Sequence, residues 1–287
     1  MKTIGIVARP DLEGAGGLLE ELAAWLKTRG LTACFEERTA ALHPGLAGGC
    51  VLPGDEVARR ADALVVLGGD GTLLAASHLL DDRKVPVLGV NFGHLGFLTE
   101  ITLPELYTVL QAVIEGRYEY EERRMLRAVV RRGGQPDHSG DVLNDVVMTK
   151  AALSRIIEPE VWVDGLFVSS FRADGLIVSS TTGSTAYNLA AGGPILHSRL
   201  PAMVLTPICP HMLTNRPLVV SDEAVVELHL LHADAADVHL TFDGQHGFPL
   251  KGGDVVSVTR SPRSVRLVKA GKDYYEVLRT KLKWGER

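Results

Sequence analysis

The chain of 287 residues is short of basic charge and contains no long apolar run. Its formal net charge of -5 offers no positive field to a phosphate polymer, so we expect no nucleic acid among its partners. No stretch reaches the roughly 18 consecutive apolar residues that a membrane-spanning helix requires. We therefore expect no membrane partner either.

Cysteines are few: Cys34, Cys50 and Cys209 are far apart in sequence and odd in number. This pattern argues against a disulfide framework and against a zinc site built on cysteines. The first residues have the pattern of a strand, with neither the long apolar segment nor the small-residue cleavage site of a signal peptide. We therefore expect a reducing, cytoplasmic location.

The composition is that of a folded chain, and the length favours two packed domains with separate cores. In the first third, apolar strands alternate with helical patterns, and a loop rich in Gly and Pro separates the second strand from the third. The strands are expected at 4–8, 32–36, 63–67 and 85–90, and the helices at 18–28, 72–80 and 104–114. This alternation predicts an α/β domain with an open parallel sheet over residues 1–118.

From about residue 118 the pattern changes to short strands separated by turns, which is typical of a β-rich domain. We expect strands at 127–132, 142–149, 160–163, 166–169, 176–179, 225–231, 238–242, 255–259 and 265–268. Helices are expected at 185–191 and at 273–283. The sequence thus predicts a β-rich domain over residues 119–268, followed by a C-terminal segment over residues 269–287.

A glycine-rich loop, Gly68-Gly69-Asp70-Gly71-Thr72, lies where a buried strand turns into a helix. In an open parallel sheet this is the carboxyl edge, where ligands bind. Glycines allow positive φ and let a bulky anion approach the amides, while the following helix contributes free N–H groups. We therefore expect a phosphate site formed by Gly68, Gly69, Gly71 and Thr72.

The acid in this loop, Asp70, sets it apart from a simple phosphate cradle, because a carboxylate repels a phosphate. As a general base, Asp70 can accept the proton of an attacking hydroxyl, which contributes about 10²–10⁴ in rate. It could also help to hold a metal, or simply cap the next helix. The loop lacks the Lys-Ser/Thr ending of a Walker A loop, and no Gly-x-Gly-x-x-Gly follows an expected strand.

The loop Gly68-Gly69-Asp70-Gly71 resembles one shared by NAD kinases, lipid kinases of the diacylglycerol type and 6-phosphofructokinases. Further motifs resemble those of NAD kinases and follow the same order, over about residues 62–250. They are Val90-Asn91-Phe92-Gly93-His94-Leu95-Gly96-Phe97-Leu98-Thr99, Leu143-Asn144-Asp145-Val146-Val147, Thr182-Gly183-Ser184-Thr185-Ala186-Tyr187, Ala191-Gly192-Gly193-Pro194-Ile195 and Asp243-Gly244-Gln245.

In the NAD kinase family an α/β domain precedes a β-rich domain, and the C-terminal segment returns to the first domain. By this resemblance Asp70 is the proton acceptor and Gly71 lies beside the bound dinucleotide. Asn144 and Asp145 are expected to hold ribose hydroxyls, a role that suits an amide and a carboxylate. The residues expected along the adenine and ribose are Thr185, Ala186, Tyr187, Asn188, Leu189 and Ala190.

Four further residues match positions that the family uses to bind the dinucleotide: Arg155, Arg172, Asp174 and Gln245. A single Arg or Asp in a β-rich domain is equally expected in a surface ion pair, and this alternative stays open. The sequence departs from the family pattern in three places. Thr181 stands where a proline is common, Ala173 where a glycine is usual, and Asp145 where many relatives have Glu.

The resemblance implies an in-line transfer, in which Asp70 takes the proton of the 2′-hydroxyl of the adenosine ribose and the oxygen attacks the γ-phosphorus. The implied partners are NAD and a nucleoside triphosphate such as ATP, with polyphosphate as another donor. A divalent cation such as Mg²⁺ and a homo-oligomer are also implied, and no side chain is assigned to the cation. Two alternatives remain: a lipid or sugar kinase with the same glycine loop, and a non-catalytic regulator that binds a dinucleotide.

Overall fold

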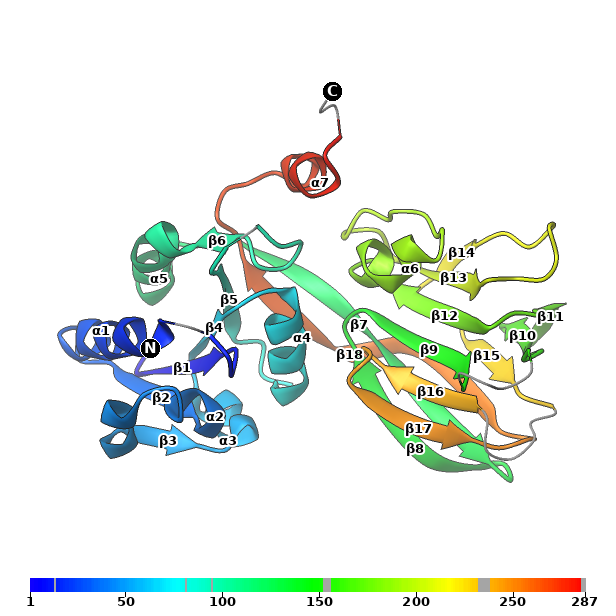
Figure 1. Cartoon of the computed structure of the whole chain (residues 1–287), viewed down its shortest axis with the longest axis horizontal. Coiled ribbons are helices and arrows are strands. Elements are labelled where there is room, and N and C mark those ends of the chain that lie inside the picture. Colours follow the sequence, from blue (N-terminus) through cyan, green and yellow to red (C-terminus); the bar gives the residue numbers. More distant parts are fainter. Residues whose placement is uncertain (13, 81, 94, 152–155, 232–237, 285–287) are drawn as a thin grey trace. The chain divides into compact units, whose positions relative to one another are not determined.

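The computed structural model of the chain describes residues 1–12, 14–80, 82–93, 95–151, 156–231 and 238–284 (Figure 1). The chain divides into two compact units. The first unit consists of Met1–Glu122 and Val265–Arg287, and the second unit of Arg123–Ser264. Among the described residues, no helix is both long and apolar enough to cross a membrane.

The first unit is built on a parallel sheet with the strand order β3-β2-β1-β4-β5, and the end of β18 pairs with β5. The strands are β1 (Thr3–Ala8), β2 (Thr32–Glu36), β3 (Cys50–Leu52), β4 (Ala63–Leu67), β5 (Pro86–Asn91), β6 (Ile101–Thr102) and β18 (Val255–Val268). Every residue of the apolar strand β4 is buried, as expected for a parallel strand covered on both faces. This arrangement confirms the open parallel sheet that the sequence predicts.

Helices cover both faces of this sheet. α1 (Ala15–Lys27) and α5 (Leu106–Ile114) pack in one apolar cluster with Ile4 and Ile6 of β1. On the other face, Gly5 of β1 leaves room for Val57 of α3 (Gly54–Arg60), and α4 (Asp70–Leu79) contacts α3 and β4. The unit also contains α2 (Glu37–Ala40), η1 (Pro44–Gly48), η2 (Leu103–Glu105) and α7 (Tyr274–Leu282).

The two central strands β1 and β4 are followed by helices on opposite faces of the sheet. β1 is followed by α1, whose Leu19, Leu22 and Leu26 recur at helical spacing and are fully buried against one face. The neighbouring strand β4 is followed by α4, which lies on the opposite face. The carboxyl ends of β1 and β4 therefore form the switch point at which open α/β sheets bind ligands.

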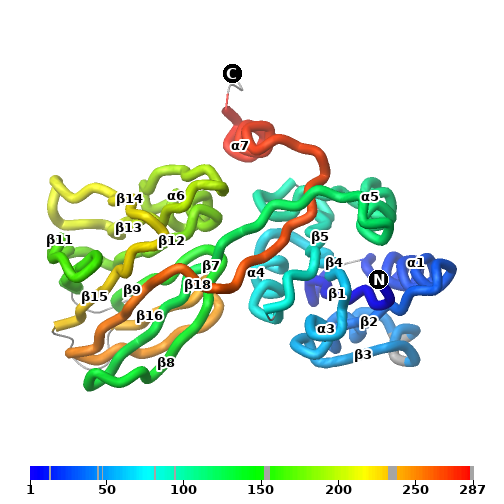
Figure 2. Tube along the Cα trace, turned by 180° about the vertical axis from the view of Figure 1, so that it is seen from behind, coloured from blue at the N-terminus to red at the C-terminus, as the bar shows by residue number. Residues whose placement is uncertain are grey.

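The second unit consists of two antiparallel sheets. One has the order β14-β13-β12-β9-β16-β17, and the other contains β11-β10-β15-β18, with β7 beside β18 and β8 beside β7 (Figure 2). The strands are β7 (Tyr120–Arg132), β8 (Gln135–Val142), β9 (Asp145–Lys150), β10 (Glu160–Val163), β11 (Leu166–Ser170), β12 (Gly175–Ser180), β13 (Ala202–Ile208), β14 (Leu218–Ser221), β15 (Val226–His229), β16 (Val238–Phe242) and β17 (His246–Leu250).

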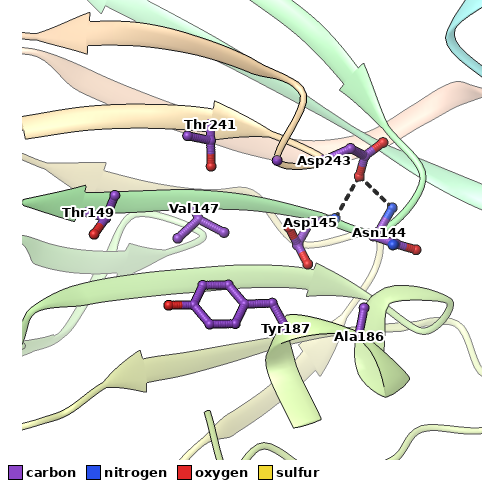
Figure 3. Close-up of a pocket in the computed structure, with 9 residues that line it drawn as sticks. Asn144, Asp145, Val147, Thr149, Ala186, Tyr187, Thr241 and Asp243 are labelled. Atoms are coloured by element: carbon purple, nitrogen blue, oxygen red, sulfur yellow. Dashed lines mark hydrogen bonds between the residues drawn. The ribbon is translucent and has the colours of Figure 1, made fainter. Parts of the chain in front are cut away.

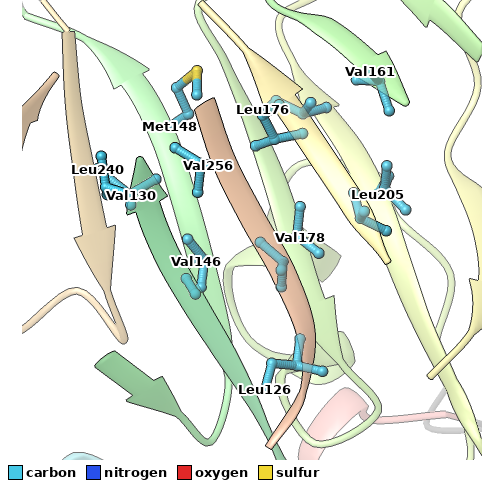
Figure 4. Packing of buried hydrophobic residues seen from close by; sticks show 14 of the residues in the cluster. Leu126, Val130, Val146, Met148, Val161, Leu176, Val178, Leu205, Leu240 and Val256 are labelled. Carbon is cyan, nitrogen blue, oxygen red and sulfur yellow. The ribbon is translucent and has the colours of Figure 1, made fainter. Parts of the chain in front are cut away.

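The two sheets of the second unit enclose an apolar core (Figure 4). Val146 and Met148 of β9 point into it, as do Leu176 and Val178 of β12. Because successive side chains of a strand point to opposite faces, the residues between them, such as Val147, lie on the outer face of this sheet. The sandwich confirms the β-rich region that the sequence predicts.

The helix expected at 185–191 is wrong in length. The structure has a short turn, η3 (Gly183–Thr185), and the four-residue helix α6 (Tyr187–Ala190). The chain leaves the helix directly afterwards, since Gly192 adopts a φ of 84°. Sequence reasoning also missed the strands β3, β6, β8, β13, β14 and β17 and the helices α2 and α3, and it divided the continuous strand β18 into two.

The expectation of unpaired cysteines is wrong as well. Cys34 of β2 and Cys50 of β3 form a disulfide. They are direct partners in the parallel register, and their Cα atoms are 4.6 Å apart, within the usual range for such a bridge. The sequence pattern gives no hint of the pair, because it places Cys50 in a loop. Cys209 is free and exposed.

Candidate active site

The glycine-rich loop lies at the carboxyl end of β4, at the switch point of the parallel sheet. Gly68 has a φ of 153°, which side chains disfavour, and a Cβ there would clash with Thr72. A Cβ at Gly69 or Gly71 would meet no atom within 4 Å. Only Gly68 therefore needs glycine for its backbone, whereas Gly69 and Gly71 leave the main chain bare at the start of α4.

Asp70 is the first residue of α4 and is half-buried. The helix cap is Gly69, so the capping alternative for Asp70 is wrong. The Asp70 carboxylate instead accepts hydrogen bonds from the backbone N–H groups of Phe97, Leu98 and Thr99, at 2.8, 3.0 and 3.0 Å. The Thr99 hydroxyl donates a further bond of 3.0 Å. Asp70 thus ties the glycine loop to the segment that follows β5.

The second unit contains a pocket of about 360 Å³ (Figure 3), a size typical of small-molecule sites. It is lined by Asn144, Asp145, Val147, Thr149, Ala186, Tyr187, Thr241, Asp243 and Gly244. Four of the residues predicted to bind the substrate therefore share one pocket: Asn144, Asp145, Ala186 and Tyr187.

Strand periodicity explains one wall of this pocket. Asp145, Val147 and Thr149 alternate along β9 with residues that face the core. Thr241 of β16 is the direct partner of Val147 in the adjacent strand. Tyr187, at the start of α6, is 47% exposed and flanks the pocket with its ring (Figure 3). The outer face of the sheet and the turn before α6 together enclose the space.

The Asp243 carboxylate fixes the residues that begin β9. Its Oδ1 accepts hydrogen bonds from the backbone N–H groups of Asn144 and Asp145 at 2.7 and 3.0 Å, and its Oδ2 accepts one from the N–H of Leu143 at 2.8 Å. In return the N–H of Asp243 donates to the carbonyl of Asp145 at 2.9 Å. These reciprocal bonds hold Asn144 and Asp145 at the pocket.

Asp145 is only 5% exposed and lies close to the charge of Asp243. Burial, followed by the negative charge of Asp243, raises the pKa of Asp145 to about 7. Asp145 therefore gains or loses its proton near neutral pH. In its neutral form it can donate a hydrogen bond to a ligand as well as accept one.

Buried polar contacts brace the turn that carries Ala186 and Tyr187. Gly183 passes so close to the Asn144 carbonyl that a Cβ there would clash. The side chain of Asn188 is fully buried. It donates to the carbonyl of Ser184 in the turn at 2.9 Å and to that of Pro194 after α6 at 3.0 Å, and it accepts a hydrogen bond of 2.6 Å from the hydroxyl of a threonine on β13. Asn188 therefore supports the turn and does not line this pocket.

Three other predicted residues lie away from the pocket lining. Arg172 pairs with Glu158 at 3.6 Å, with both side chains more than half exposed, and Asp174 pairs with Lys150 at 3.4 Å. Both contacts are the surface ion pairs that the sequence left as an alternative. Gln245 is exposed in the turn between β16 and β17.

The last predicted residues are Thr185, Leu189, Ala190 and Arg155. The first three belong to the turn and helix around Tyr187 without lining this pocket. Arg155 lies outside the described residues. Sequence reasoning did not select Val147, Thr149 and Thr241 as pocket residues. The alternation in β9 could have indicated the first two, whereas Thr241 depends on the pairing of β9 with β16.

Comparison with known proteins gives a consistent result over the whole chain. Residues 54–118 match a family model described as the ATP-NAD kinase N-terminal domain, and residues 143–270 match the ATP-NAD kinase C-terminal domain. The NAD kinases of Geotalea daltonii and Citrifermentans bemidjiense are each 50% identical over 288 residues, which covers 100% of this chain and 100% of each relative.

Solved structures show the same fold. Yeast NADH kinase complexed with NADH superimposes with a TM-score of 0.90 at 24% identity, over 100% of this chain and 89% of that one. An NAD kinase from Archaeoglobus fulgidus in complex with ATP gives a TM-score of 0.76 at 23% identity, over 99% of this chain and 100% of that one.

Proposed function

The chain belongs to the NAD kinase family, and we propose how its residues carry out that reaction. It is a phosphotransferase that phosphorylates the 2′-hydroxyl of the adenosine ribose of NAD to give NADP. The observation that carries the proposal is the carboxylate of Asp70, which hydrogen bonds hold at the phosphate-binding edge of a parallel sheet.

The pocket of the second unit binds the adenosine part of the dinucleotide. Its volume suits a nucleoside, and the Tyr187 ring provides an apolar surface for a base. Asn144 and Asp145 supply donors and acceptors for the ribose hydroxyls, and Asp243 fixes the backbone of both. We therefore propose that the β-rich residues 119–268 form a dinucleotide-binding domain.

Asp70 accepts the proton of the ribose 2′-hydroxyl as the oxygen attacks the γ-phosphorus. The new P–O bond forms as the bond between the γ-phosphorus and the β,γ-bridging oxygen breaks, and ADP leaves with that electron pair. Bare amides at Gly69 and Gly71 and the free N–H groups of α4 stabilise the phosphate charge. Arg172, Asp174 and Gln245 contact the dinucleotide only outside this pocket.

ATP is the proposed donor, since the N-terminal and C-terminal matches are both ATP-NAD kinase models. A divalent cation such as Mg²⁺ would accompany the ATP and, when bound, would neutralise phosphate charge. Among the described residues, no three His, Cys, Asp or Glu side chains gather into a metal site. No side chain and no step of the reaction are assigned to the cation.

The comparisons favour this function over a lipid or sugar kinase, because the relatives named NAD kinase match along their entire length. We further propose a cytoplasmic location, where NAD and ATP are both present. A homo-oligomer is supported by the edge strand β11, which exposes 73% of Leu166 and 53% of Phe167.

The Asp70→Asn variant tests the assignment of the base. The amide nearly preserves the shape of the side chain but cannot take up the hydroxyl proton. We expect NADP formation, measured by a coupled assay with ATP and NAD, to fall by about 10²–10⁴. NAD binding, measured by calorimetry, should change little. Near-normal turnover in this variant would remove Asp70 as the base, and a wild-type chain that binds NAD without forming NADP would be a silent regulator.

A further inference from the structure

The two oxygens of the Asp70 carboxylate are bonded unequally. Oδ1 accepts three hydrogen bonds, from the N–H groups of Leu98 and Thr99 and from the Thr99 hydroxyl, each at 3.0 Å. Oδ2 accepts one, from the N–H of Phe97 at 2.8 Å. An ionised carboxyl oxygen has about two lone-pair sites. Oδ1 is therefore saturated, whereas Oδ2 keeps a lone pair that can receive a proton.

Among the hydrogen bonds that the described residues donate to the Asp70 carboxylate, only that of Thr99 Oγ1 comes from a side chain, and the others come from backbone N–H groups. Thr99 is fully buried, and its hydroxyl oxygen accepts a hydrogen bond of 3.1 Å from the Asn91 side-chain nitrogen. Because Asn91 occupies one lone pair of this oxygen, the hydroxyl proton is directed to Asp70 Oδ1. The side-chain oxygen of Asn91 is held in turn by the N–H of Gly93 at 2.6 Å.

Two glycines pack closely against these groups. A Cβ on Gly96 would clash with both the Asp70 carboxylate and the Thr99 hydroxyl. Gly89 of β5 is similarly close to the Thr99 methyl group, since a Cβ on Gly89 would lie 3.1 Å from Cγ2 of Thr99. The carboxylate and the hydroxyl are thus fitted to each other by glycines on two sides.

We propose that Thr99 is a positioning residue for Asp70: its hydroxyl, oriented by Asn91, fixes Oδ1 so that Oδ2 stays available to take the hydroxyl proton. This inference rests on the proposed function, since it assumes that Asp70 is the base. Loss of the hydroxyl removes one of the three hydrogen bonds to Oδ1 and the contact that links the carboxylate to Asn91, so the orientation of the carboxylate is less tightly fixed. Misplacement of a catalytic group by about 1 Å lowers the rate by up to about 10².

The test compares Thr99→Val, which keeps the shape and loses the hydroxyl, with Thr99→Ser, which keeps the hydroxyl. We expect kcat for NADP formation to fall roughly 10- to 100-fold in Thr99→Val while KM for NAD changes less than about twofold. Thr99→Ser should recover most of the lost kcat. If Thr99 had a merely structural role, the two variants would have the same kcat once both are compared at an equal folded fraction. Circular dichroism measures that fraction.

Thr102 offers a matched control, because its hydroxyl also donates to a carboxylate, that of Glu105, at 2.7 Å. Thr102→Val removes this bond away from Asp70, so wild-type kcat is expected. Should Thr99→Val not fold, Thr99→Ser and Thr99→Cys replace it as a pair, since both lack the methyl group and differ in donor strength. A higher kcat for Ser than for Cys supports the proposal, and equal values overturn it.

The outcomes separate this inference from the proposed function. Wild-type kcat in Thr99→Val, together with an inactive Asp70→Asn, overturns the role of Thr99 and leaves Asp70 as the base. Active Asp70→Asn overturns the base assignment and the role of Thr99 with it. A loss of kcat in Thr99→Val that Thr99→Ser does not recover also overturns the proposal, because the methyl group would then be the part that matters.

Discussion

At the scale of single residues, Asp70 and Asp243 share one structural device. Each carboxylate accepts hydrogen bonds from the backbone N–H groups of three consecutive residues, 97–99 for Asp70 and 143–145 for Asp243. Carboxylates bonded to several N–H groups hold loops firmly, since each bond to a charged group contributes about 1.5–3 kcal/mol. Each aspartate therefore organises the segment beside it in addition to any chemical role.

Asp145 gives a prediction on pH at the same scale. Its folded pKa of about 7 lies above its ordinary value of 3.8, so the folded chain retains a proton that the unfolded chain has lost. Stability from this group is therefore greatest below about pH 4 and declines as the pH rises towards about 7. Asp145→Asn stays neutral, so it should stabilise the unliganded chain more at pH 8 than at pH 5.

The size of this effect follows from the pKa difference. At about 1.4 kcal/mol for each unit, the gain from Asp145→Asn should grow by at most roughly 3 kcal/mol between pH 5 and pH 8. Urea unfolding at both values measures it. Because the variant is compared with the wild type at each pH, the contributions of the other carboxylates to the free energy of unfolding cancel. An equal gain at both values would contradict a proton that titrates near neutral pH.

At the scale of elements, the Cys34–Cys50 bridge links β2 to the short strand β3. It closes a segment with a sequence separation of 16, for which a disulfide stabilises the fold by about 3 kcal/mol. We expect dithiothreitol to lower the Tm of the oxidised chain by several degrees. Cys34→Ser/Cys50→Ser should melt at the lower temperature with or without the reductant.

Cys209 provides the control for this prediction, because it is free and exposed. Cys209→Ser should keep the full response to dithiothreitol. Thiol counting by mass spectrometry after alkylation without reductant should find one modified cysteine in the oxidised wild-type chain. Three modified cysteines under oxidising conditions, with an unchanged Tm, would show that β2 and β3 are held together without the bridge.

Elements with a strong local signal were predictable from the sequence. The buried run of β4 and the helical spacing of leucines in α1 mark these elements, and the bounds of β4 are as expected. β3 was not predictable, because three residues carry no period, and the helix around α6 was predicted too long. Asp70 stood out by its place among glycines, but its bonds to Phe97 and Thr99 depend on tertiary packing that no local pattern encodes.

The pocket shows the same limit. Asn144 and Asp145 were predicted from a motif, and the pocket brings them together with Ala186 and Tyr187, about forty residues later. Thr241 lies beside them only because β16 pairs with β9. The alternation of apolar and polar residues within a strand does not show which distant strand it pairs with. A sequence motif therefore predicts some of the residues that line a pocket, but it does not predict the residues that neighbouring strands contribute.

At the scale of the whole molecule, the described residues form two apolar clusters without a shared member, one in each unit. Leu176 is fully buried in the cluster of the second unit, and Leu88 in that of the first. Replacing a buried leucine by alanine costs about 2–5 kcal/mol. We expect Leu176→Ala to accelerate amide exchange in β9 and β12 of the second unit and to leave β1 and β4 protected.

The reciprocal variant completes this last prediction. Leu88→Ala should accelerate exchange in β1 and β4 while β9 and β12 keep their protection, since each unit contains its own core. Hydrogen exchange measured by mass spectrometry resolves these strands through their peptides. If either substitution accelerates exchange equally in both units, the chain opens as one cooperative body. The covalent connection through β7 and β18 would then couple two cores that share no side chain.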